Sequence, residues 1–176
     1  ATNTFTEGGS AVAVAAADFA VDLVESGDTV STLVFTITNV TDASEALNVD
    51  GSALDLLTAA TGTTTTGNYA YSVAYDAGAD VSTVTLSSLT LSEADAATLV
   101  KAVTYENSSE DPTAGNRVVS VEIVDSGSNT GSNDNTTTEQ LNTITVAAVN
   151  DAPEITNTDA TNTFTEGGSA VAVAAA

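Results

Sequence analysis

Hydrophobic and polar side chains alternate in several short stretches of the chain, most clearly at residues 30–40. Leu33, Phe35 and Ile37 fall on one side of an extended chain, and polar residues fall on the other. This period of two is typical of a β-strand with one buried face. The same pattern predicts further strands at 69–75, 81–87, 119–123 and 143–148, and two short strands at 2–6 and 11–17 on either side of Gly8-Gly9.

One segment has the helical period instead. Ser92 stands where it can cap a helix N-terminus. Downstream of it, hydrophobic side chains recur at the i, i+3, i+4 and i+7 spacing of one helix face. They are Ala96, Leu99, Val100 and Val103. We therefore expect an all-β fold, an antiparallel β-sandwich, with one short helix near 92–103.

The first seventeen residues recur later in the chain. ATNTFTEGGSAVAVAAA occupies residues 1–17 and again residues 160–176, so the repeat period is 159 residues. Because solenoid repeats span only about 20–50 residues, we expect each repeat here to be a domain with its own core. Residues 1–153 would form one module that lacks its first few residues. Residues 154–176 would begin the next identical module, after a linker at Asn150–Pro153.

Acidic residues far outnumber basic ones. The chain has 24 Asp and Glu against 2 Lys and Arg, a net charge of −22, and it has no Cys or His. The shortage of cations argues against nucleic acid and anionic membranes as partners, and no hydrophobic run is long enough for membrane insertion. Without His or Cys, imidazole and thiolate chemistry is excluded, and we expect no enzymatic activity. Abundant carboxylates suit hard cations, above all Ca²⁺.

The acidic side chains gather at predicted turns. Carboxylates that lie close together repel one another unless a cation sits between them. Two interpretations stay open: these residues are Ca²⁺ ligands, or they are solvated loop charges that keep the protein soluble. An EF-hand loop and a glycine-rich calcium nonapeptide are both absent. The clusters comprise Asp18, Asp22, Glu25 and Asp28; Glu106, Glu110 and Asp111; Asp125; and Asn150 with Asp151.

Four motifs in order resemble one family. They are FTEGG at 5–9, YENSSEDPTAGNR at 105–117, VSVEIVDSG at 119–127 and AVNDAPEI at 148–155. Together they resemble the cadherin-like tandem repeats of giant bacterial surface proteins, which include RTX-type adhesins and extracellular matrix filament proteins. The resemblance implies a Greek-key β-sandwich of the cadherin or immunoglobulin type, an extracellular location at the bacterial cell surface, and Ca²⁺ at the joints between modules.

The resemblance also implies a ligand set for these joints. At the linker end, the matching residues are Glu7, Glu110, Asp111, Asn150 and Asp151. At the opposite end they are Asp22 and Asp125, which would serve the joint with the preceding module. The family's second acid after Asp22 is missing, and Glu25 or Asp28 would replace it. The linker has Ala152 where eukaryotic cadherins have a second Asn.

We therefore expect a structural repeat of a long adhesin or filament, stiffened by Ca²⁺ at its joints. Its partners would be neighbouring identical modules and other copies of the chain. Two alternatives stay open. One is a self-assembling filament or surface-layer subunit, in which a strand at 161–165 is exchanged between modules. The other is an adhesive module that binds a glycan or a protein directly.

Overall fold

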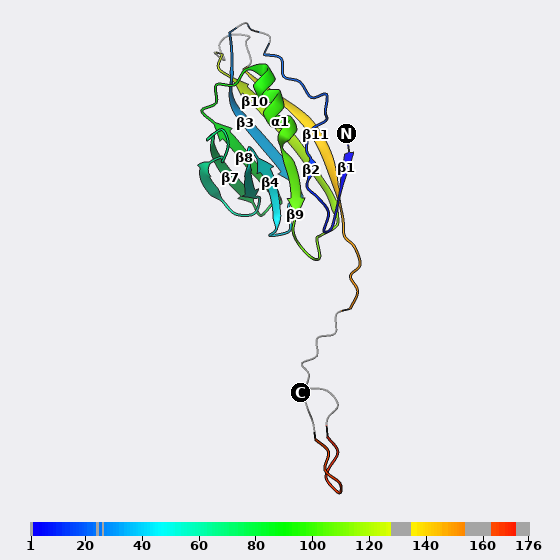
Figure 1. Ribbon diagram of the computed structural model, residues 1–176. Helices are drawn as coiled ribbons and strands as arrows, with labels where there is room; N and C mark the ends of the chain where they lie inside the picture. The colour runs from blue at the N-terminus through cyan, green and yellow to red at the C-terminus, as the bar shows by residue number, and fades with distance from the viewer. Residues whose placement is uncertain (1, 24, 26, 128–134, 154–162, 172–176) are drawn as a thin grey trace.

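The computed structural model describes residues 2–23, 25, 27–127, 135–153 and 163–171. Two β-sheets face each other across a hydrophobic core, and one helix lies beside the smaller sheet (Figure 1). The larger sheet has the order β1 (Thr2–Thr6), β11 (Thr136–Ala147), β10 (Gly115–Asp125), β3 (Val30–Thr38), β8 (Val81–Ser87), β7 (Ala70–Asp76) and β6 (Ala60–Thr63). The smaller sheet has the order β2 (Val12–Ala13), β9 (Thr104–Asn107), β4 (Glu45–Val49) and β5 (Ser52–Asp55).

The predicted all-β sandwich with one short helix is confirmed. β3 lies at the centre of the large sheet between β10 and β8, and its alternate residues Leu33, Phe35 and Ile37 are completely buried. The period-two pattern thus places a row of large hydrophobic side chains in the core. The burial of such side chains supplies most of the stabilisation of this kind of fold. The strands predicted at 2–6 and 81–87 have the observed bounds of β1 and β8.

Two expectations about strands need correction. The strand predicted at 11–17 is only two residues long, because its partner β9 begins at Thr104, directly after the helix, and no further strand pairs with the segment. The sheets are also not wholly antiparallel. β1 runs parallel to β11, with Thr2 opposite Thr143 and Thr6 opposite Ala147.

The helix α1 (Glu93–Ala102) forms where the spacing of hydrophobic residues changes from a period of two to a helical period. The side chain of Ser92 accepts a hydrogen bond of 3.2 Å from the backbone N–H of Asp95, and thereby caps the N-terminus. Ala96, Leu99 and Val100 are buried in the same core cluster as the strands. α1 therefore covers the part of the large sheet beyond the N-terminal end of β9 (Figure 1).

The first segment of the chain joins the two sheets. β1 adds to the large sheet beside β11, and β2 adds to the small sheet beside β9. Between them, Phe5 is buried to 1% exposure and its ring meets the ring of Tyr105 edge to face, with centroids 5.7 Å apart at 87°. This segment therefore closes one side of the sandwich.

The second copy of the segment is described only at residues 163–171, which are exposed, with Phe164 at 61%. The predicted start of the next module at 154–162 lies outside the described residues, as does most of the loop predicted after Asp125. The described helix is too short and too polar to cross a membrane.

Candidate functional site

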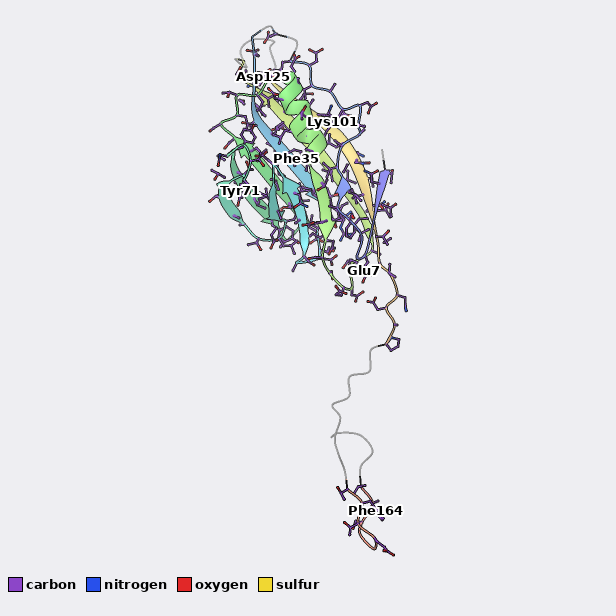
Figure 2. The ribbon with its side chains drawn as sticks, in the orientation of Figure 1. Glu7, Phe35, Tyr71, Lys101, Asp125 and Phe164 are labelled. Atoms are coloured by element: carbon purple, nitrogen blue, oxygen red, sulfur yellow. The ribbon has the colours of Figure 1, made fainter. Side chains whose placement is uncertain are left out.

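The predicted ligand residues lie at two ends of the sandwich. Figure 2 shows Glu7 at the end where the chain leaves β11, and Asp125 at the opposite end. Glu7 directly follows β1, and its backbone N–H donates to the carbonyl of Ala147 at 3.0 Å. Its carboxylate Oε2 accepts a hydrogen bond of 2.7 Å from the backbone N–H of Val149. Glu7 is thus attached to Val149, the residue directly before the linker.

The other acids at this end are exposed. Glu110 and Asp111 lie in the loop between β9 and β10, and Asn150 and Asp151 lie in the linker. The side chain of Asn150 donates to the carbonyl of Asp151 at 3.0 Å. Among the described residues, no hydrogen bond connects this loop to Glu7 or to the linker pair. The linker end therefore presents separate oxygen donors rather than an assembled group.

The opposite end brings three carboxylates together around Gly127. Asp125 Oδ1 and Asp28 Oδ2 lie 2.9 and 3.0 Å from the position that a Cβ atom on Gly127 would occupy, and Glu25 Oε2 lies 3.5 Å from it. The backbone N–H of Gly127 donates to Asp125 Oδ1 at 2.7 Å. The structure thus joins Asp125 with both residues that were expected to substitute for the missing acid. Asp22 lies exposed in the same bend.

Backbone contacts hold this arrangement in place. The N–H of Ser126 donates to the carbonyl of Thr29 at 2.8 Å, and the N–H of Thr29 donates to Ser126 Oγ at 3.0 Å. These bonds attach the bend before β3 to the end of β10. The convergence of the carboxylates is therefore a product of the sheet, because β3 and β10 are neighbouring antiparallel strands.

A Ca²⁺ site has requirements that the group around Gly127 meets only in part. Carboxylate oxygens are the ligands that Ca²⁺ prefers, and it takes about six to eight of them. In the part of the chain that the structure describes, no group of three or more Asp, Glu, His or Cys side chains is arranged to hold a metal ion. The carboxylates around Gly127 match a hard cation in the type of ligand they offer, but their arrangement does not form a metal site.

A buried ion pair is the polar feature that the sequence analysis missed. Arg117 is 1% exposed and Glu45 is completely buried. Arg117 Nε and Nη2 donate to the two carboxylate oxygens of Glu45 at 3.0 and 2.8 Å, and Tyr105 Oη donates to Glu45 Oε2 at 2.8 Å. Burial and the charge of Glu45 raise the pKa of the Tyr105 phenol, which therefore stays a donor. No short-range pattern predicts this pair, because its members lie 72 positions apart.

Asp42 connects the ion pair to the loop between β9 and β10, which carries Glu110 and Asp111. Asp42 lies 3.3 Å from Arg117 Nη2 and accepts hydrogen bonds from the N–H and Oγ1 of Thr113 at 2.9 and 2.6 Å, and from Asn107 Nδ2 at 2.8 Å. Partial burial alone would raise the pKa of Asp42, but these hydrogen bonds and the charge of Arg117 outweigh it and lower the pKa below 3.8. Asp42 thus fixes both ends of the loop that carries Glu110.

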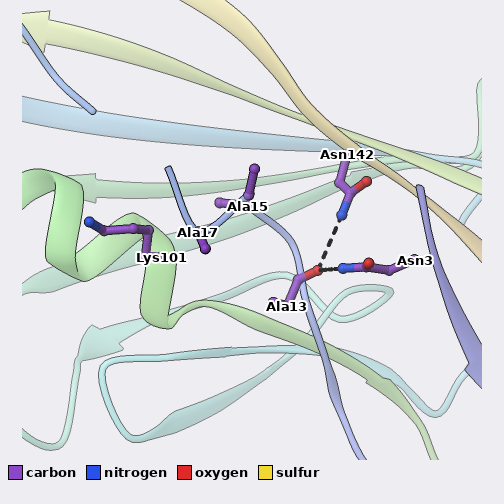
Figure 3. Close-up of a pocket in the computed structure, with 7 residues that line it drawn as sticks. Asn3, Ala13, Ala15, Ala17, Lys101 and Asn142 are labelled. Carbon is purple, nitrogen blue, oxygen red and sulfur yellow. Dashed lines mark hydrogen bonds between the residues drawn. The ribbon is translucent and has the colours of Figure 1, made fainter. Parts of the chain in front are cut away.

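A pocket of about 480 Å³ lies between the first segment, β11 and α1 (Figure 3). The side-chain amides of Asn3 and Asn142 both donate to the carbonyl of Ala13, at 2.7 and 3.5 Å. The remaining lining consists of three alanines and Lys101. Both amides therefore hold β2 in place rather than presenting these donors to a ligand.

Comparisons of the chain with protein-family models, with curated proteins and with solved structures found no match.

Proposed function

We propose that this chain is a structural repeat of a long extracellular bacterial adhesin or filament, in which identical modules follow one another and Ca²⁺ stiffens their joints. One observation carries the proposal. The sequence that closes the sandwich at residues 2–13 is repeated after the linker, where Phe164 is exposed and Phe5 is buried. A segment with a core side chain and no core of its own is the expected start of a further module.

The distribution of charge supports the calcium part of the proposal. Asp125, Asp28 and Glu25 converge at one end, and Glu7, Asn150 and Asp151 lie at or beside the linker at the other. In a tandem array, the end of one module would meet the opposite end of the next. Each end then supplies part of a ligand set, which is consistent with the incomplete group at Gly127.

Without a cation, the facing carboxylates repel each other and the linker acts as a hinge. A bound Ca²⁺ ion would neutralise these charges and hold both modules to the linker, so the array would become stiffer. The resemblance to cadherin-like surface repeats and the net charge of −22 agree with this mechanism. The extracellular location follows from the same resemblance.

Small-angle scattering of a chain of two complete repeats, in Ca²⁺ and in chelator, tests the proposal. Ca²⁺ should narrow the distribution of distances between modules and increase the maximum dimension. The double variant Asp28→Asn and Asp125→Asn in the second repeat should abolish this response. Asp55→Asn and Glu139→Gln, which lie on β5 and β11, remove the same charge elsewhere and should leave it intact. A distance distribution that is identical in Ca²⁺ and chelator would refute the calcium mechanism.

A further inference from the structure

The first segment occupies a well-defined slot in the sandwich, between β11 and β9. Five residues of β1 form a parallel ladder with β11, and Val12 and Ala13 pair with Tyr105 and Thr104. Phe5 fills the space in front of the Tyr105 ring. Asn3 links the two strands of the segment through its hydrogen bond to the carbonyl of Ala13. The slot therefore binds the backbone and one aromatic side chain of the segment, and the Asn3 amide holds the two strands of the segment together.

The C-terminal copy has the same sequence and already has the same turn. In the first copy, Gly8 has φ +67° and the N–H of Gly9 donates to the carbonyl of Thr6 at 2.8 Å. In the second copy, Gly167 has φ +76° and the N–H of Gly168 donates to the carbonyl of Thr165, also at 2.8 Å. The turn thus forms without a sandwich around it, so docking does not have to create it.

We propose that the slot takes residues 161–171 of a second copy of this chain when its own first segment is displaced, so that chains join end to end without a covalent bond. The occupant is identified by its sequence, because residues 161–171 reproduce all the side chains that residues 2–12 place in the slot. The exposed Phe164 gains most from the exchange, since it replaces water with the Tyr105 ring.

The direction of the chain favours a second molecule over the same one. Residues 148–153 lead away from the sandwich at the end of β11 (Figure 1). The incoming strand must run parallel to β11. To enter its own slot, the chain would have to turn back past the whole ladder before pairing, and a strand from another molecule has no such constraint.

The two copies would make equivalent contacts in the slot. Which copy occupies it therefore depends on how each is connected to the sandwich. The first copy continues directly into Val14 and is held near its slot, which favours it in an intact single chain. When the binding of the first copy to the slot is weakened, the second copy of another molecule binds there more favourably. Head-to-tail exchange of this kind is a heterologous contact, which produces open chains wherever the rotation between molecules does not close a ring. The inference rests on the repeat architecture of the proposed function, but not on Ca²⁺.

Disulfide trapping tests the exchange, because the chain has no native Cys. The acceptor carries Thr145→Cys together with Phe5→Ala and Phe164→Ala, which weaken both of its own segments. The donor carries Thr163→Cys alone. Thr145 is the ladder partner of Thr4, the residue equivalent to Thr163. A mixed disulfide between acceptor and donor is therefore expected, and because each chain has one Cys, it can form only between molecules.

Two matched donors define the contact. Adding Phe164→Ala to the donor should reduce the cross-link at least ~10-fold, since it removes the aromatic anchor. A Thr165→Cys donor should also cross-link poorly, because the equivalent Thr6 pairs with Ala147 instead. All samples contain chelator, so a failure of the calcium mechanism does not affect the result.

Circular dichroism checks that the acceptor is folded. If Phe5→Ala unfolds it, Asn3→Ala replaces that change, because it removes only the hydrogen bond to Ala13. Cross-linking that is equal for the three donors would overturn the proposal, and so would the absence of the mixed disulfide with a folded acceptor.

Discussion

The carboxylate of Glu7 accepts a hydrogen bond from the backbone N–H of Val149, at 2.7 Å and across 142 positions of sequence. The turn after the first strand thus restrains the chain as it leaves the last one. The residues between β11 and the linker are therefore restrained up to Val149, and the hinge of the proposed joint begins at Asn150.

Removal of this bond should loosen the linker without unfolding the domain. A net hydrogen bond contributes about 0.5–1.5 kcal/mol, so Glu7→Ala should speed hydrogen exchange at the Val149 amide by roughly 5-fold. Glu166→Ala changes the identical residue of the second copy and serves as the control. Equal exchange rates in the two variants would show that Glu7 does not hold the linker.

The two copies of the segment also provide a matched pair for stability. Phe5→Ala removes a buried ring and should lower the free energy of unfolding by about 3–5 kcal/mol. Phe164→Ala changes an exposed ring in the same sequence context and should have an effect within about 0.5 kcal/mol. Urea unfolding followed by circular dichroism measures both. Similar losses in the two variants would mean that the second copy is also packed.

The buried ion pair should be costly to break. Arg117→Met leaves Glu45 without its charge partner in the core, and we expect a loss of about 3–5 kcal/mol in unfolding free energy. Lys101→Met removes the other basic residue from an exposed position and should change stability by less than about 0.5 kcal/mol. The same urea titration compares them. A small effect of Arg117→Met would show that the ion pair does not stabilise the fold.

Asp42 should give the fold an acid-sensitive component. The pKa of Asp42 in the folded protein is below the ordinary 3.8 of the unfolded chain. The ionised carboxylate therefore stabilises the fold above pH 3.8, and this contribution is lost as the pH falls through the lower, folded pKa. The stability difference between the native protein and Asp42→Asn should shrink as the pH is lowered from 7 to about 2. Asp18→Asn, at an exposed position, should show no such convergence.

A substitution of Gly127 tests the three converging carboxylates without changing a core residue. A Cβ at this position would lie within 3.0 Å of both Asp125 Oδ1 and Asp28 Oδ2, so Gly127→Ala must push these oxygens apart. We expect Ca²⁺ affinity of the two-repeat chain to fall about 10-fold by calorimetry, a change of about 1.4 kcal/mol. Gly78→Ala is the control, since its Cβ would meet a single carboxylate oxygen, of Asp76, at 3.3 Å. Unchanged affinity in Gly127→Ala would remove this group from the joint.

The sequence predicted the strands whose own side chains show which face is buried. β8 alternates strictly and β3 does so from Leu33 onward, and α1 combines a helical period with a capping serine, so local pattern was sufficient for these elements. β6 and β5 were missed because they lie at sheet edges and bury little. All four residues of β6 are exposed, and β5 buries only Leu54.

β4 was missed for a different reason. Its inward row contains Glu45, and a charge at a core position argues against a strand unless a partner is known. That partner is Arg117 on β10, which only the tertiary fold brings close. The position of the carboxylates around Gly127 also could not be predicted from local sequence. The sequence named these acids as turn residues, but their convergence depends on the pairing of β3 with β10.

The parallel pairing of β1 with β11 has a mechanical consequence. Tension on a tandem array would pull on the start of β1 and on the end of β11, which lie at opposite ends of the paired stretch. The force then acts along the strands and loads all of their mutual hydrogen bonds in shear at once, whereas an antiparallel hairpin at the same place would open one bond at a time. A module with this geometry is suited to bear load along its strands, as the proposed array of repeats would require.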